Sequence, residues 1–394
     1  MQADNSFTNE GLFFTDDSNV EKYTPVKPEH MTRVHWGQWK LILADIEFLT
    51  MFWNPQDVPN PIFVSVGAAP GQHYPILMKM FPQFRFVLYD PRPFSFKVES
   101  LGDMADRVDI RNQLFTDEDT KEWQGRKDVF FTSDIRSVNV EDLMEQGFSK
   151  QDASKRLMDA VQDDMIMQGN WVELVDPVFA MLKFRLPYVD TDPLTGKILD
   201  VHVEYLDGYM MKQQWAPHSS TEVRLIPVKK PDGTYAKKLW SSEKHQDKLF
   251  YFNQFQRELF QYKNVFTDEP KPYSDELLNT YDDTATIVIL KMYLEKFSGE
   301  ETTSEQVVAL YKVITADINS HRRNVVSLKQ LRQSSTRSTV KKVAATSGGA
   351  PGAKKPPSKV RRAGGSVSTT GARPSTARAR PVVATKRQGS TVPK

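Results

Sequence analysis

The stretch PIFVSVGAAPGQH, residues 61–73, decides the fold of this chain. Its first half is an apolar run rich in Phe and Val, which is typical of a buried strand. Its second half breaks into Gly67, Pro70 and Gly71, which indicates a tight loop, and a helix-like segment follows at 74–81. Because glycines let the backbone approach a ligand and a helix N-terminus offers free N–H groups, this order predicts a ligand-binding turn. A plain strand–turn–helix connection is the alternative.

The alternation of strands and helices continues on both sides of this stretch. Residues 36–53 have helix-like apolar spacing, a long helix is expected from about 140 to 170, and residues 246–330 are mostly helical by pattern. The other strand-like segments are 84–90, 108–110, 127–134, 178–188, 202–206 and 221–228. Strands that alternate with helices predict an α/β, Rossmann-like fold around a central, mostly parallel sheet.

Charge and composition divide the chain into parts. It holds 52 basic and 50 acidic residues, but 15 of the basic and none of the acidic ones lie in residues 331–394. Residues 1–330 therefore carry 37 basic against 50 acidic residues, a net charge of −13. We expect an extended arm over 1–30, a folded domain with a helical C-terminal part over 31–332, and a disordered basic tail over 333–394.

Composition also excludes several kinds of protein. The absence of cysteine excludes disulfide scaffolds, thiolate metal sites and cysteine nucleophiles. The seven histidines show no metal-ligand spacing, so no metal site is predicted. The polar, acidic start lacks the pattern of an export signal, and the apolar stretch 41–53 is too short to span a bilayer. We therefore expect a soluble, cytoplasmic protein that has no membrane partner.

The next strand-like segment limits the kinds of cofactor that the loop could bind. Asp90 ends it 23 residues after Gly67, and an acid near that separation accepts hydrogen bonds from ribose hydroxyls in Rossmann-like folds. The loop has neither the three glycines of a dinucleotide fingerprint nor the Gly-Lys-Ser/Thr of a Walker loop. The pattern favours an adenosyl ligand without a pyrophosphate, such as S-adenosylmethionine, and disfavours a dinucleotide-dependent oxidoreductase.

Six segments resemble, in order and spacing, the poxviral family of cap-specific mRNA 2′-O-methyltransferases, which also serve as processivity subunits of poly(A) polymerase. The segments are GQWKLILADIEFL (37–49), VGAAPGQH (66–73), YDPR (89–92), FTSDIR (131–136), LKFRLPY (182–188) and TEVRL (221–225). The resemblance implies methyl transfer from S-adenosylmethionine to the first transcribed nucleotide of m7G-capped mRNA. It also raises a poly(A) polymerase catalytic subunit as a partner. A non-enzymatic RNA-binding or processivity subunit that keeps the fold is the alternative.

The resemblance implies a catalytic set of two lysines and two acids, namely Lys40, Asp134, Lys183 and Glu222. Lys183 interrupts an apolar run, where a lysine is costly to desolvate unless it has carboxylate partners. An amine takes a hydroxyl proton near neutral pH only if its pKa is lowered, which burial and a second ammonium would achieve. Taken singly, each residue has a structural alternative as a helix cap, a strand-edge residue or part of a solvated face.

Further residues are matched to ligands through the same resemblance. Those near the cofactor are Gly67, Ala69, Pro70, Gly71, Asp90, Arg92, Phe115, Thr116 and Asp134. Tyr23 and Tyr188 match two aromatic residues that sandwich the cationic 7-methylguanine, and Asp190 matches an acid at the base edge. The chain departs from the family pattern at Gln246, which stands in place of a second pocket acid beside Asp247, and at Ser219, in place of a third tyrosine.

Overall fold

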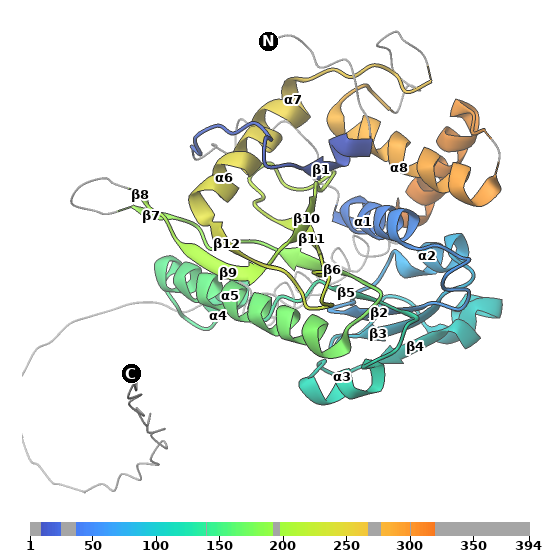
Figure 1. The fold of residues 1–394 in the computed structure, drawn as a ribbon, viewed down its shortest axis with the longest axis horizontal. Helices are drawn as coiled ribbons and strands as arrows, with labels where there is room; N and C mark the ends of the chain where they lie inside the picture. Colours follow the sequence, from blue (N-terminus) through green and yellow to red (C-terminus); the bar gives the residue numbers. More distant parts are fainter. Residues whose placement is uncertain are drawn as a thin grey trace, which may run out of the picture. The chain divides into compact units, whose positions relative to one another are not determined.

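The computed structural model describes residues 9–24, 37–138, 140–191, 198–266, 277–299 and 301–319. Its centre is an eight-stranded sheet with the strand order β1–β10–β11–β6–β5–β2–β3–β4 (Figure 1). The sheet confirms the predicted α/β, Rossmann-like class. Residues 1–8, 25–36 and the whole of the predicted tail, 333–394, lie outside the described residues, so the predicted disorder of the tail stays a prediction.

Five neighbouring strands run parallel and form the half of the sheet that carries the glycine loop. They are β2 (Ile62–Val66), β3 (Arg85–Tyr89), β4 (Val108–Arg111), β5 (Val129–Ser133) and β6 (Phe179–Phe184). Every residue of β2 and β5 is buried, as expected of predominantly apolar strands covered on both faces. The strand order reverses between β2 and β5, and ligands of such sheets bind at this reversal, beyond the carboxyl ends of the strands.

The remaining strands extend the sheet in antiparallel fashion. They are β11 (Val223–Pro227), β10 (Gly208–Met211) and β1 (Phe13–Phe14). Strand β1 and the short helix η1 (Asn9–Leu12) before it belong to the segment that we expected to be an extended arm. Leu12 and Phe14 are buried in the core, because the exposed edge of β10 offers this segment a hydrogen-bonding partner.

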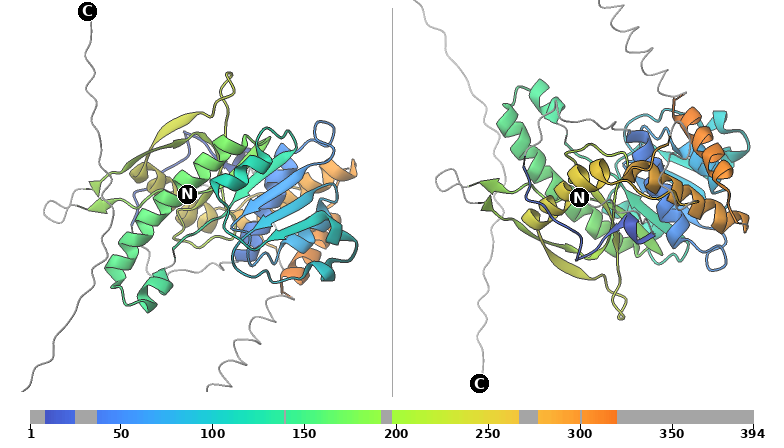
Figure 2. Two further views of the ribbon diagram at one scale, coloured as in Figure 1. Left: turned by 90° about the horizontal axis from the view of Figure 1, so that it is seen from below. Right: turned by 90° about the horizontal axis from the view of Figure 1, so that it is seen from above.

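Helices cover both faces of the sheet. Helices α1 (Gly37–Phe52), α2 (Tyr74–Met80) and α8 (Tyr281–Ser298) lie on one face, and α3 (Asp117–Trp123) and α5 (Lys150–Val175) lie on the other (Figures 1 and 2). The helical stretch predicted from about 140 to 170 is confirmed, and it consists of two helices. A separate helix, α4 (Val140–Glu145), precedes α5, since Gly147 has a φ of +92° and the Ser149 side chain caps α5.

The C-terminal part of the described chain is mostly helical, as predicted. It comprises α6 (Ser242–Tyr251), the π-helical turn η4 (Phe252–Gln256), α7 (Arg257–Leu259), α8 and a helical segment over 304–319. Smaller elements are the 3₁₀ segment η3 (Val98–Arg107) and the pairs β9 (His202–Leu206) with β12 (Lys237–Ser241) and β7 (Asp190–Thr191) with β8 (Ile198–Leu199). Among the described helices, none combines the length and apolarity needed to cross a membrane.

Candidate active site

The loop after β2 approaches the end of β5 so closely that only glycine fits. Gly67 has a φ of +77°, and a Cβ atom there would lie 2.9 Å from the backbone of Asp134. Gly71 has a φ of +64°, and its Cβ atom would meet the rings of Tyr74 and Phe94. The backbone therefore requires glycine at both of these positions of the predicted ligand-binding turn. A cavity of about 50 Å³ lies against this loop and is lined by Ala69, Pro70 and Asp134 among others.

Asp90, at the end of β3, holds this loop in place. Its carboxylate accepts hydrogen bonds from the Ala69 backbone N–H at 3.0 Å, the Arg92 backbone N–H at 2.9 Å, and the Arg92 Nε and Nη2 atoms at 3.0 and 2.8 Å. Burial disfavours its charge, but these donors keep the pKa of Asp90 below its usual value. These four bonds use the acceptor capacity of the carboxylate. A ribose contact at Asp90 therefore requires the largely exposed Arg92 side chain to move, and this contact stays a prediction.

Phe115 and Thr116, which the family resemblance places near the cofactor, at its adenine, lie just beyond β4. Phe115 is buried, and its ring packs edge-on against Tyr89 at 4.8 Å and against Trp171 at 5.1 Å. Thr116 caps α3, with its hydroxyl donating to Asp119 at 2.7 Å. The cavity lining does not include either residue. Their contact with adenine stays a prediction.

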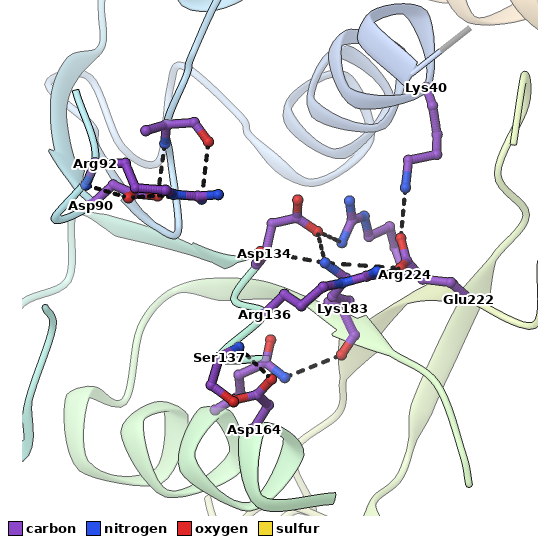
Figure 3. A network of polar contacts seen from close by, with 12 residues as sticks. Lys40, Asp90, Arg92, Asp134, Arg136, Ser137, Asp164, Lys183, Glu222 and Arg224 are labelled. Carbon is purple, nitrogen blue, oxygen red and sulfur yellow. Dashed lines mark hydrogen bonds and ion pairs between the residues drawn. The ribbon is translucent and has the colours of Figure 1, made fainter. Parts of the chain in front are cut away.

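The four residues of the implied catalytic set meet beside the loop (Figure 3), although they come from four separate segments. Lys40 lies on α1, Asp134 follows β5, Lys183 lies on β6, and Glu222 precedes β11. The distances are 3.0 Å from Lys183 Nζ to Asp134 Oδ1, 3.8 Å from Lys183 Nζ to Glu222 Oε2, and 2.6 Å from Lys40 Nζ to Glu222 Oε1. Three of the structural alternatives are wrong: the side chain of Lys40 is only 15% exposed and so does not lie on a solvated face, that of Glu222 is only 5% exposed, and Lys183 lies on β6, which is not an edge strand.

Both carboxylates of this cluster are ionised. Burial opposes the charge of Asp134, but Arg224, Lys183 and Lys40 hold its pKa well below the usual range. Burial likewise opposes the charge of Glu222, whose pKa is held low chiefly by Lys40 and Lys183. For Lys40 the balance is reversed, because burial lowers its pKa more than the attraction of Glu222 raises it. The cluster can therefore keep two fixed negative charges while an amine gives up its proton.

Arg224 and Arg136 belong to the cluster but were not among the predicted site residues. Arg224 is buried, and its Nη1 donates to Asp134 Oδ1 at 2.7 Å. The half-exposed Arg136 places Nη2 3.3 Å from Glu222 Oε2. A signal for Arg224 exists in the sequence, since it lies two residues after Glu222 in the strand-like segment 221–228, and residues two apart in a strand share a face.

The two tyrosines matched to the cap lie near each other. Burial raises the pKa of Tyr23, and the neighbouring Tyr188 hydroxyl raises it further. The Tyr23 ring packs edge-on against Phe250 of α6 at 5.7 Å. Tyr188 is 38% exposed, and the Arg185 guanidinium lies over its ring at 4.6 Å. Stacking of a methylated base between the two rings stays a prediction.

The polar residues matched to the cap lie in different environments, and the structure does not describe all of their side chains. Gln246 of α6 is buried, and its Nε2 has no hydrogen-bond partner among the described residues. The adjacent Asp247 accepts the Tyr23 backbone N–H at 2.9 Å and so holds the N-terminal segment on α6. Asp190 begins β7, but its side chain lies outside the described part of the structure. Ser219 is exposed.

A family model described as "Poly A polymerase regulatory subunit" matches residues 7–319. The chain belongs to this family. The similar curated proteins include two poxviral proteins named cap-specific mRNA (nucleoside-2′-O-)-methyltransferase. The protein of Myxoma virus (strain Lausanne) is 25% identical over 254 residues, which cover 62% of this chain and 69% of that protein. The protein of Fowlpox virus (strain NVSL) is 24% identical over 221 residues, which cover 55% of this chain and 65% of that protein.

Membership of the poly(A) polymerase regulatory subunit family confirms the resemblance inferred from the six sequence segments. All six fall within the matched range. They supply the glycine loop, Asp90 and the four charged residues of the cluster. In the described part of the chain, no group of three or more His, Asp or Glu residues could hold a metal ion.

Proposed function

We propose that this chain is a methyltransferase that moves a methyl group from S-adenosylmethionine to the ribose 2′-hydroxyl of the first transcribed nucleotide of m7G-capped RNA. The observation that carries the proposal is the position of the Lys183 side chain. Its Nζ lies 3.0 Å from Asp134, which in turn touches the glycine loop, and its side chain remains 14% exposed. An amine held in this way is oriented by carboxylates and can still reach a substrate hydroxyl.

The residues around the cavity fit such a cofactor. When bound, S-adenosylmethionine supplies a methyl group on a positively charged sulfur, which leaves as a neutral thioether. Gly67 and Gly71 let the backbone approach the ligand. Lys183 Nζ takes the 2′-hydroxyl proton as the oxygen forms its bond to the methyl carbon. Asp134 and Glu222 hold the lysine side chain in position beside the hydroxyl. Positioning of reacting groups supplies much of the rate acceleration of such an enzyme.

The charge of the cluster supports a role for a lysine as the base. Four cations, Lys40, Lys183, Arg136 and Arg224, contact the two carboxylates Asp134 and Glu222. An excess of neighbouring positive charge favours the neutral form of an amine. The same local positive charge attracts the phosphates of an RNA chain, although the domain as a whole carries a net negative charge. The same cluster therefore serves both the substrate and the base.

Recognition of the cap is assigned to Tyr23 and Tyr188, with Asp190 and Gln246 at the base edge. Methylation at N7 makes guanine cationic, and stacking between two electron-rich rings is then strengthened. The Myxoma and Fowlpox proteins are named as cap-specific enzymes, which supports the same substrate here. Because these relatives are poxviral proteins, we also infer a cytoplasmic location, in an infected cell or a virion.

A second function is favoured by the family description. A regulatory subunit of poly(A) polymerase implies a catalytic polymerase subunit as a partner. The two roles are compatible, because methyl transfer uses one edge of the sheet and leaves other surfaces for a partner. A purely non-enzymatic subunit is disfavoured, since it would have no need of two buried lysines on two carboxylates, which are costly to desolvate.

Transfer of a labelled methyl group tests the proposal. Three RNAs of one sequence are compared: m7G-capped, capped with unmethylated guanosine, and m7G-capped with a 2′-O-methyl group already on the first nucleotide. We expect label only on the first RNA, at the first nucleotide after digestion. Label on the third RNA, or none on any, would overturn the proposal. Processive poly(A) addition with a polymerase subunit, in the absence of methyl transfer, would favour the non-enzymatic alternative.

A further inference from the structure

Helix α6 and the turn η4 hold the backbone that leads into Glu222. Three of their side chains donate to backbone carbonyls of the segment just before this residue. The bonds are His245 Nε2 to Thr221 O at 2.8 Å, Asn253 Nδ2 to Ser220 O at 2.8 Å, and Gln254 Nε2 to His218 O at 3.1 Å. The segment 218–222 belongs to no regular element, so these bonds replace the backbone ladder that would fix it in a strand.

The His245 bond is the nearest of the three to the reacting groups. The ring is buried, and burial lowers its pKa to about 4, so the imidazole is neutral at neutral pH. A carbonyl can only accept, which places the imidazole proton on Nε2. The ring also packs edge-on against Phe184 at 5.3 Å. Phe184 follows Lys183 directly, and Thr221 precedes Glu222 directly, so one imidazole contacts the neighbours of both residues.

The same helix carries the residues that hold Tyr23. The carboxylate of Asp247 accepts the Tyr23 N–H at 2.9 Å, and its backbone carbonyl accepts the Glu21 N–H at 3.2 Å. The Phe250 ring supports the Tyr23 ring. One face of α6 therefore fixes the tyrosine assigned to the cap, and another fixes the approach to Glu222.

We propose that His245 is a positioning residue for methyl transfer, which fixes Glu222 against Lys40 and Lys183 by holding the Thr221 carbonyl. This inference rests on the proposed function. The contacts at stake are short, 2.6 Å from Glu222 to Lys40 and 3.8 Å to Lys183. A misplacement of about 1 Å at such a site can cost about 10²-fold in rate. Because α6 also holds Tyr23, the bond from His245 to the Thr221 carbonyl and the position of Tyr23 depend on the same helix.

Two amide substitutions of different length test this role. The Gln side chain in His245→Gln can bring its amide near the position of Nε2, whereas the shorter Asn side chain in His245→Asn cannot reach the carbonyl. Lys244→Gln, at an exposed position of the same helix, is the matched control. Initial rates on capped RNA are divided by the number of cofactor-binding sites, so that unfolded protein does not count. Binding of m7G nucleotide is measured in parallel.

We expect His245→Asn to lower kcat roughly 10- to 100-fold with little change in m7G affinity. His245→Gln should stay within about threefold of the unaltered protein, like Lys244→Gln. Thermal melts of the three variants are recorded alongside the rates. A merely structural role would lower thermal stability and the number of cofactor-binding sites without a selective loss of kcat per site.

Two results would overturn the inference while leaving the proposed function intact. One is an unaltered kcat in His245→Asn, and the other is an equal loss of kcat in the Gln and Asn variants. Failure of the unaltered protein to methylate capped RNA would instead reject the proposed function, and the inference with it.

Discussion

Arg224 and Lys183 lie directly opposite each other on β11 and β6, and both contact the same oxygen of Asp134. The distances to Asp134 Oδ1 are 2.7 Å from Arg224 Nη1 and 3.0 Å from Lys183 Nζ. One cation is permanently charged and the other can give up its proton. Arg224 therefore keeps Asp134 ionised and in place whether or not Lys183 carries a proton, which is what an orienting carboxylate requires.

Arg224→Met should destabilise the protein by about 3 kcal/mol, because it removes the buried partner of an ion pair and leaves Lys183 as the remaining cation in contact with Asp134. It should also reduce methyl transfer, since Asp134 loses its fixed partner. The free energy of unfolding is measured in urea. Arg126→Met is the control, because Arg126 pairs with Asp128 at the surface, where such a pair contributes about 0–1 kcal/mol. Equal effects of the two substitutions would contradict the role given to Arg224.

Stability should fall as the pH drops from about 6.5 toward 4, partly through His245. Burial lowers the pKa of His245 to about 4; the Thr221 carbonyl opposes this shift, while the charges of Lys248 and Arg185 add to it. The unfolded chain takes up the proton at about pH 6.5. Between these values only the unfolded state binds a proton, so the free energy of unfolding decreases as pH falls, by about 1.4 kcal/mol per pH unit.

Urea titrations at pH 7.5 and pH 5 measure this slope. His245→Gln removes the ionisable group and should flatten it, whereas His202→Gln, at a half-exposed histidine, should change it little. The carboxylates of Asp134 and Glu222, whose pKa values are lowered, lose their contribution only at still lower pH. A slope that is the same in the His245→Gln variant would show that His245 does not cause it.

Gly67→Ala should abolish cofactor binding, because the methyl group would lie 2.9 Å from the Asp134 backbone and force the loop away from β5. Gly125→Ala is the matched control. Gly125 has a φ of +76°, nearly that of Gly67, but no atom lies within 4 Å of the position that an added methyl group would take. Both substitutions cost about 1–2 kcal/mol for the left-handed backbone. Only Gly67→Ala should lower S-adenosylmethionine affinity, by more than about tenfold in calorimetry, and retained affinity would place the cofactor elsewhere.

Tyr188→Ala should reduce the preference for 7-methylguanosine over guanosine nucleotides by about tenfold, which corresponds to about 1.4 kcal/mol of stacking on a cationic base. Tyr209→Ala, at an exposed tyrosine of β10, should leave the preference unchanged. Fluorescence quenching measures both affinities. Equal binding of the two nucleotides by the unaltered protein would mean that this chain lacks cap preference, which the departure at Gln246 would explain.

The order of elements could be predicted because it is a local property. Strands β2 and β5 are predominantly apolar, and the glycines of the loop interrupt the pattern where the backbone must turn. The extra strand β1 could not be predicted in the same way. Its two phenylalanines lie in a polar segment, and they are buried only because the edge of β10 accepts them.

The site required more than local pattern. Lys40 and Glu222 form an ion pair at 2.6 Å although 182 positions separate them, and only the family resemblance indicated that they meet. Arg224 escaped prediction because a charged residue in a strand is usually exposed, and its burial depends on Asp134 from another strand. His245 escaped because its partner is a backbone carbonyl, which leaves no trace in the sequence.

The proposed reaction depends most on Lys183 as the base, and its substitution by alanine tests this role directly. The rate of methyl transfer to m7G-capped RNA is measured together with the affinity for S-adenosylmethionine. We predict a loss of rate of about 10²–10⁴-fold, with cofactor affinity within about threefold of the unaltered protein, because we assign the cofactor to the glycine loop and Asp90 and not to Lys183. Near-normal turnover in Lys183→Ala would contradict this role.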